Sequence, residues 1–161
     1  GDETVNLYFL RHGLADWPEW NRPDDERPLT DDGIKRMKAE AKAIKRFDLG
    51  LDTILSSPLI RARQTADLVA ERLGLSVTES KLLAPGFNKD RLAKLLASYK
   101  DAKAIMLIGH EPDFSATIAS LIGGGRVAMK KGGLARVDID SADSLEGELV
   151  WLLAPKVLTT E

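Results

Sequence analysis

The sequence predicts an α/β fold: a three-layer α/β/α sandwich with a mostly parallel central sheet. Short apolar runs that are typical of strands alternate along the chain with longer segments whose apolar residues recur at helical spacing. Strands separated by helices need crossover connections, which favour parallel neighbours and helices on both faces of the sheet. The 161 residues contain neither an internal repeat nor a linker, so we expect a single domain over residues 1–161.

Strands are expected where short runs are apolar and rich in strand-forming residues. These runs are Val5–Leu10, Asp52–Ser56, Ser76–Glu79, Ala104–Ile108, Leu134–Ile139 and Glu148–Leu153. We expect the last two strands to pair with each other. Helices are expected after Thr30, after Ser57-Pro58, over Asp90–Tyr99 and over Asp113–Ile122.

Cap residues mark where two of these helices begin and end. Thr30 can accept a hydrogen bond at the start of the first helix, which ends before Gly50. Ser57-Pro58 predicts the start of the second, with serine as the N-cap and proline at the first helical position. This second helix should stop near Gly74.

Two regions are expected to be loops. Residues 14–29 contain three prolines, and the acidic run Asp24–Glu26 inside them is interpreted only as solvated charge. Residues 123–126 and 130–133 are rich in glycine but lack the spacing of a Walker phosphate loop. We expect them to form a mobile loop near the edge of the sheet where a ligand binds.

Composition excludes several classes of function. The formal net charge of −2 argues against broad nucleic-acid binding, which needs a basic surface. No apolar run approaches the roughly 20 residues of a membrane-spanning helix, so neither nucleic acid nor a membrane is an expected partner. The absence of cysteine excludes disulfides, thiolate metal sites and cysteine nucleophiles. It also fits a reducing compartment, and we expect a cytoplasmic protein.

The chain has only two histidines, and both follow predicted strands. His12 comes directly after the first strand, and His110 follows the central apolar strand almost directly. Because ligands of parallel α/β sheets bind outside the carboxyl ends of the strands, both histidines should lie at that edge. Arg11 precedes the first histidine, and Arg61 lies in the first turn of the helix after the second strand, near the same edge.

Two arginines and two histidines at one edge can bind and transfer a phosphoryl group. Guanidinium groups offer paired donors to phosphate oxygens, and their charge disfavours imidazolium, which keeps a histidine neutral and nucleophilic. Phosphoryl transfer needs mainly in-line positioning and neutralisation of the oxygens. Two other interpretations remain open: the histidines could bind a metal with Asp16 or Glu111, and Arg61 could be an ordinary surface residue.

Four motifs resemble, in order and in separation, those of the histidine phosphatase superfamily, also called the phosphoglycerate mutase-like family. They are Leu10-Arg11-His12-Gly13, Arg27-Pro28-Leu29-Thr30 with Gly33, the run from Ser56 to Ala66 and Gly109-His110-Glu111. The resemblance covers nearly the whole chain. The short length, and the ending Gly147–Leu153 followed by Pro155-Lys156, are most similar to the SixA-type phosphohistidine phosphatases.

The resemblance implies a phosphatase in which His12 accepts the phosphoryl group while Arg11, Arg61 and His110 bind it. Neutral His12 would attack phosphorus, and water would then hydrolyse the phosphohistidine enzyme. No metal or organic cofactor is implied. The implied partner is a phosphorylated protein, such as a histidine phosphotransfer domain, or a small phosphorylated molecule. The alternatives are a broad small-molecule phosphomonoesterase and a non-catalytic phosphate-binding module.

The chain departs from the larger members of this family in two places. Leu14-Ala15-Asp16 lacks their phosphate-binding hydroxyl, for which Asn21 is a candidate replacement, and Leu83–Asn88 lacks the inserted acidic proton donor. An open site without a strong acid favours phosphohistidine, because imidazole, with a pKa of about 6.5, is a good leaving group. Asp16 and Glu111 are candidate proton donors. Alternatively, Asp16 is a solvated loop acid and Glu111 a favourable charge at a helix N-terminus.

Overall fold

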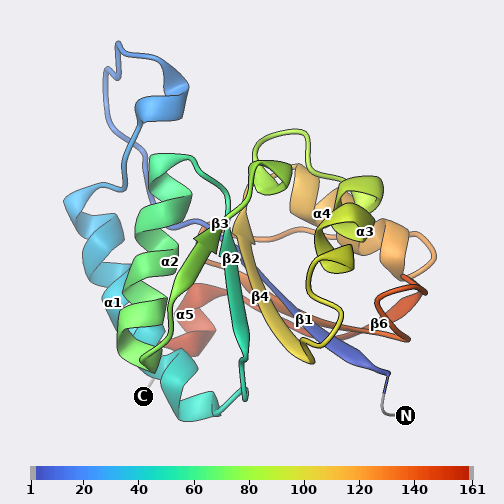
Figure 1. The fold of residues 1–161 in the computed structure, drawn as a ribbon. Helices are drawn as coiled ribbons and strands as arrows, with labels where there is room; N and C mark the ends of the chain where they lie inside the picture. The colour runs from blue at the N-terminus through green and yellow to red at the C-terminus, as the bar shows by residue number, and fades with distance from the viewer. Residues whose placement is uncertain (1–2, 160–161) are drawn as a thin grey trace.

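The computed structural model describes residues 3–159, in which one six-stranded sheet lies between two layers of helices (Figure 1). The strands are β1 (Val5–Arg11), β2 (Thr53–Ser56), β3 (Val77–Glu79), β4 (Ala104–Gly109), β5 (Leu134–Ile139) and β6 (Gly147–Leu153). The helices are α1 (Asp31–Phe47), α2 (Ile60–Leu73), α3 (Lys89–Ala97), α4 (Asp113–Leu121) and α5 (Pro155–Leu158), with short 3-10 turns η1 (Asp24–Glu26) and η2 (Lys81–Leu83). The predicted α/β/α sandwich is confirmed.

The sheet is mixed but mostly parallel, as predicted. Its strand order is β3-β2-β4-β1-β5-β6, and the first four strands in this order pair in parallel. β5 is antiparallel to β1, and β6 is antiparallel to β5. Only β5 therefore runs against the other described strands, and the predicted pairing of the two late strands is confirmed.

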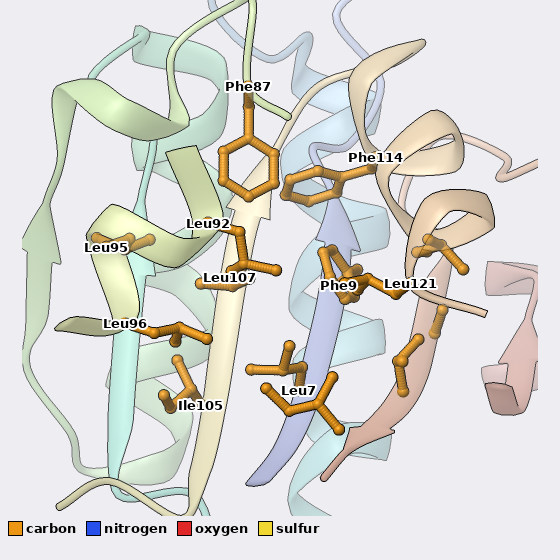
Figure 2. Packing of buried hydrophobic residues seen from close by; sticks show 14 of the residues in the cluster. Leu7, Phe9, Phe87, Leu92, Leu95, Leu96, Ile105, Leu107, Phe114 and Leu121 are labelled. Atoms are coloured by element: carbon orange, nitrogen blue, oxygen red, sulfur yellow. The ribbon is translucent and has the colours of Figure 1, made fainter. Parts of the chain in front are cut away.

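Successive side chains along β1 point to opposite faces of the sheet and pack into two apolar cores, one on each face. Tyr8 and Leu10 pack with residues of α1, α2 and α5, whereas Leu7 and Phe9 pack with residues of α3 and α4. On the second face, the ring of Phe114 makes edge contacts with two other rings, at centroid distances of 5.1 Å to Phe9 and 5.7 Å to Phe87 (Figure 2). Such edge-to-face packing adds directional contacts to the burial of apolar area.

The start of α1 is built as the sequence predicts. The Thr30 hydroxyl accepts a hydrogen bond from the Gly33 backbone N–H at 2.9 Å, and the Thr30 backbone N–H donates to the Leu14 carbonyl at 3.0 Å. A Cβ atom on Gly33 would lie 2.1 Å from that carbonyl, so only glycine allows this approach. The two ends of the loop over residues 14–29 are thus fixed against each other.

The predicted start of α2 is wrong by two residues. The helix begins at Ile60, and Leu59 stands at the N-cap without a side-chain hydrogen bond. The backbone N–H of Ser57 donates to the Ile108 carbonyl at 2.9 Å, so the chain stays extended beyond the last residue of β2. The Ser57 hydroxyl still accepts from the Leu59 backbone N–H at 3.2 Å, but it also bonds a distant histidine.

Other differences from the prediction are small. The predicted strands agree with the structure to within one residue at each end, whereas α5, η1 and η2 were not predicted. Short elements of this kind carry too few residues for a periodic pattern. No helix in the part of the chain that the structure describes is both long enough and apolar enough to cross a membrane.

A buried acid lies on α1. Glu40 is 1% exposed, and its Oε2 atom has no hydrogen-bond partner among the described residues. Burial raises the pKa of this carboxyl from 4.5 to about 8, so the side chain is protonated at neutral pH. Between these two values the native state holds a proton that the unfolded state releases. Through Glu40 alone, the free energy of unfolding should therefore fall by about 1.4 kcal/mol per pH unit as the pH rises.

We expect Glu40→Gln, which keeps the shape of the side chain but cannot ionise, to raise the free energy of unfolding at pH 8 by at least ~1 kcal/mol. The advantage should shrink as the pH falls toward 5. Urea unfolding at the two pH values measures it, with Glu71→Gln on the exposed face of α2 as the control for loss of one carboxylate. An advantage of the same size at both pH values would contradict this account.

Candidate active site

The two histidines meet at the carboxyl ends of neighbouring parallel strands. Arg11 is the last residue of β1 and lies opposite Gly109, the last residue of β4. The backbone N–H of His12 donates to the Gly109 carbonyl at 3.1 Å, which continues the ladder by one residue. The rings of His12 and His110 then lie with centroids 5.4 Å apart, at 56° to each other. The predicted edge of the sheet thus holds both histidines.

His12 is buried and electrically neutral. Its Nδ1 atom lies 2.8 Å from the Gly13 carbonyl, which can only accept, so Nδ1 carries the proton and Nε2 keeps its lone pair. Burial lowers the pKa of His12 to about 3, and the bond to Gly13 opposes this shift. The electrostatic interactions of His12 with His110, Arg61 and Arg11 lower its pKa further. At neutral pH the side chain is therefore an uncharged base.

His110 is held by a side chain from the second motif. Its Nε2 atom lies 2.7 Å from the Ser57 hydroxyl, and both residues are buried. Burial lowers the pKa of His110 to about 4; Arg61 and Arg11 lower it further, and Asp24 acts in the opposite direction. The same hydroxyl thus serves two partners, since it also accepts from the Leu59 backbone N–H. The signal available in the sequence was a hydroxyl directly after a strand at the ligand edge.

Arg11 is fastened by the glycine-rich segment that precedes β5. Its Nη1 atom donates to the Met129 carbonyl at 2.8 Å. The Gly132 N–H donates to the carbonyls of Arg11 and His12 at 3.1 and 3.0 Å, and the Arg11 N–H donates to the Gly133 carbonyl at 3.0 Å. The segment lies at the active edge, as predicted, and its backbone forms the frame of the first motif.

Arg61 is anchored by Asp24, a residue of the loop over residues 14–29 that was expected to be only solvated charge. The Arg61 side chain is only 6% exposed, and its two terminal nitrogens donate to Asp24: Nη1 to the backbone carbonyl at 2.7 Å, and Nη2 to Oδ2 at 3.0 Å. The interpretation of Asp24 as merely solvated charge is therefore wrong, and so is the alternative of Arg61 as a surface residue. The sequence did contain a signal for this ion pair. The loop after the first strand carries an acid and leaves the sheet at the edge where Arg61 was expected.

Thr65 links the first motif to the second. Its hydroxyl donates to the Arg61 carbonyl at 2.8 Å and accepts from the Gly13 backbone N–H at 3.1 Å. The residue is fully buried. No role was predicted for Thr65, because a threonine inside an amphipathic helix gives no sequence signal for such a bridge.

Three buried nitrogens of this group have no hydrogen-bond partner among residues 3–159. They are Arg11 Nε, Arg61 Nε and His110 Nδ1. Because buried polar atoms in proteins are normally satisfied, three unpartnered donors or acceptors on neighbouring side chains fit a site for a polar ligand. All of the arginine nitrogens are donors, which suits the oxygens of an anion.

The two candidate proton donors already have partners. Glu111 Oε1 accepts from the Ser115 backbone N–H at 2.8 Å, and Oε2 accepts from the Ser115 hydroxyl. These bonds place the Glu111 carboxylate at the N-terminus of α4, where negative charge is favourable. Asp16 accepts two bonds from Lys131 Nζ, at 2.6 and 2.5 Å, and these bonds hold the pKa of Asp16 below its usual range. Within residues 3–159, no three His, Cys, Asp or Glu side chains group together so that they could hold a metal ion.

Comparison with known proteins identifies the class of this site. The model of the histidine phosphatase superfamily (branch 1) matches residues 7–84. An uncharacterised protein of Picosynechococcus is 35% identical over 164 residues, a match that covers 96% of this chain and 99% of that protein. The chain belongs to the histidine phosphatase superfamily, as its motifs predict, and is a phosphatase.

Within this superfamily the fold is similar to that of SixA. The structure of the protein histidine phosphatase SixA complexed with tungstate superposes with a TM-score of 0.83 at 26% identity, covering 96% of this chain and 99% of that one. A SixA protein from Agrobacterium tumefaciens gives 0.77 at 25% identity, over 94% and 99% of the two chains. A 2,3-bisphosphoglycerate-dependent phosphoglycerate mutase of Methylobacterium radiotolerans is 37% identical, but only over 44% of this chain and 34% of the mutase. The predicted similarity to SixA is therefore confirmed over nearly the full length.

We expect Ser57→Ala to lower the free energy of unfolding by about 1–3 kcal/mol, because a buried nitrogen of His110 loses its partner. It should also slow hydrolysis of a general substrate such as p-nitrophenyl phosphate. Ser56→Ala is the matched control, since the Ser56 hydroxyl is as deeply buried but donates to the Ser57 carbonyl at 2.9 Å. Urea unfolding and initial rates measure both effects. An equal loss of activity in the two variants would show that Ser57 does not orient His110.

Proposed function

We propose that the protein hydrolyses phosphohistidine on a phosphorylated protein through a covalent intermediate on His12. The observation that carries the proposal is the state of this side chain: buried, neutral, and bonded through Nδ1 to Gly13, so that Nε2 is the nucleophilic atom. A histidine with a purely structural role would not be expected to combine a free Nε2 lone pair with two neighbouring arginines.

In the first step, the Nε2 lone pair of His12 attacks phosphorus and forms a P–N bond. The bond between phosphorus and the substrate imidazole breaks, and the leaving nitrogen takes the electron pair and a proton from solvent. In the second step, water attacks phosphorus, the bond to His12 breaks, and inorganic phosphate leaves with regeneration of the neutral imidazole. In both steps the three phosphoryl oxygens carry negative charge that the site must neutralise.

Arg11, Arg61 and His110 are the proposed ligands of those oxygens. Each contributes a buried nitrogen that has no partner among the described residues. Because these groups are fixed by bonds to Met129, Asp24 and Ser57, little reorganisation is needed when charge develops. The site can therefore stabilise both transfer steps with the same three groups.

A protein-bound phosphohistidine is favoured by the segment between β3 and α3. Residues 83–88 contain no carboxylate, and the segment is tied down: the Gly86 backbone N–H donates to Asp113 Oδ2 at 2.7 Å, and the Leu83 and Phe87 side chains lie in the core. No acid from this segment can protonate an alkoxide leaving group, whereas imidazole leaves readily. The similarity to a protein histidine phosphatase supports the same substrate class. The partial match to phosphoglycerate mutases keeps a small phosphomonoester as the second candidate.

We expect His12→Ala to lower the rate of phosphate release from a phosphohistidine protein by at least about 1,000-fold, because the nucleophile is lost. The assay is run in EDTA beside a phosphoserine peptide, which the wild type should cleave far more slowly. Arg63→Ala is the control: Arg63 pairs with Asp67 at 2.9 Å and Glu79 at 3.2 Å, and should be dispensable. Equal cleavage of both substrates by the wild type would favour the small-ester alternative. Binding of phosphate without turnover would favour a binding module.

The proton donor is tested with Glu111→Gln and Asp16→Asn. We expect the variant of a true donor to lose at least tenfold in hydrolysis of an alkyl phosphate but little in hydrolysis of phosphohistidine, whose leaving group needs less assistance. The ratio of the two rates is compared between each variant and the wild type. Equal losses on both substrates would mean that the residue supports the site without donating a proton.

A further inference from the structure

Arg11 and Arg61 are held in the same manner, although they come from different elements. In each guanidinium, Nη1 donates to a backbone carbonyl, of Met129 for Arg11 and of Asp24 for Arg61, at 2.8 and 2.7 Å. In each, Nε is buried and has no partner among the described residues. The terminal end of each arginine is thus anchored in the protein, while the inner nitrogen stays available. Arg61 has a second anchor, from Nη2 to Asp24 Oδ2.

We propose that Asp24 is a positioning residue, which fixes the terminal end of Arg61 so that the remaining donors of the guanidinium are set for a phosphoryl oxygen. The inference rests on the proposed function and names a further residue of the same site. The hydrogen bonds of Asp24 in the site go to Arg61, and its charge also raises the pKa of His110.

Asp24 is suited to this role because its own side chain and backbone carbonyl are held by Arg27. Arg27 donates from Nε to Asp24 Oδ1 at 3.0 Å, and its backbone N–H donates to the Asp24 carbonyl at 3.0 Å. Another nitrogen of Arg27, Nη1, donates to the Ala15 carbonyl, three residues beyond His12. A chain of hydrogen bonds therefore connects the loop after the first motif, through Arg27 and Asp24, to Arg61.

The charges agree with this arrangement. The bond from Arg27 and the charge of Arg61 hold the pKa of Asp24 below its usual range, so the carboxylate is ionised at neutral pH. Arg61 would otherwise be a buried cation with a single bond to a neutral carbonyl, which is unfavourable. The Asp24 side chain is 64% exposed, so its contribution is moderated by solvent and by salt.

The alternative to positioning is that Asp24 competes with phosphate for the donors of Arg61. A competitor would occupy the donors that the ligand needs, and its removal would strengthen binding. The free Nε of Arg61 argues against this, because the guanidinium can offer a ligand that nitrogen without releasing Asp24. The two readings predict effects of opposite sign.

The test is the affinity for inorganic phosphate, measured by calorimetry, together with kcat and KM on a phosphohistidine protein. We expect Asp24→Ala to weaken phosphate binding by about five- to tenfold and to lower kcat. Urea stability should fall moderately, because buried Arg61 loses one of its two anchors while solvent screens the exposed carboxylate. Asp24→Asn, which keeps an acceptor oxygen, should recover part of the loss. Asp25→Ala is the control, because it removes the adjacent acidic side chain from η1, where Asp25 is also exposed.

A double-mutant cycle separates positioning from general charge effects. In an Arg61→Met background, which leaves no cation to pair with Asp24, Asp24→Ala should have almost no further effect on phosphate affinity, because the two residues act as a unit. Unchanged or tighter binding in Asp24→Ala, equal effects of the Asp24 and Asp25 variants, or no phosphate binding by the wild type would each overturn the inference. A wild type that binds phosphate but hydrolyses nothing would instead overturn the proposed function, and the affinity measurements would still decide the role of Asp24.

Discussion

The site depends on the parallel register between β1 and β4. This pairing places Arg11 opposite Gly109 and lets the next residue, His12, continue the ladder by one hydrogen bond. The two imidazoles meet only because each follows its strand at the same level. A shift of one residue would exchange the two faces of β1 and separate the rings, so the register that packs the two cores also sets the site.

The position of β4 depends in turn on its packing against α4. A Cβ atom on Gly109 would lie 2.7 Å from the ring of Phe114, so a glycine at the end of the strand lets α4 lie close against the sheet. The same ring is packed between Phe9 and Phe87 (Figure 2). Because tightly packed interiors resist small displacements, the geometry of the site inherits the rigidity of this core.

The sequence predicts the elements and the gathering of four side chains, but not what holds those side chains in place. Strand ends and the Thr30 cap are local patterns, so periodicity and cap chemistry locate them. Three hydrogen bonds join residues at least 37 positions apart: those between Ser57 and His110, Thr65 and Gly13, and Asp24 and Arg61. Such pairs depend on how the elements are stacked in three dimensions. The predicted helix start at Ser57-Pro58 failed for this reason, since the bond from the Ser57 N–H to the distant Ile108 carbonyl keeps the chain extended there.

The loop over residues 14–29, which rises beyond the edge of the sheet in Figure 1, is closed at its base by the bond from Thr30 to Leu14. The entropic cost of closing a loop grows only slowly with its length. Residues could thus be added or lost near its tip at modest cost, provided that Asp24 keeps its reach to Arg61. A closed base thus separates two demands: the residues that bind the phosphoryl group can stay fixed while the surface at the tip changes. Relatives with one mechanism could in this way come to recognise different partners.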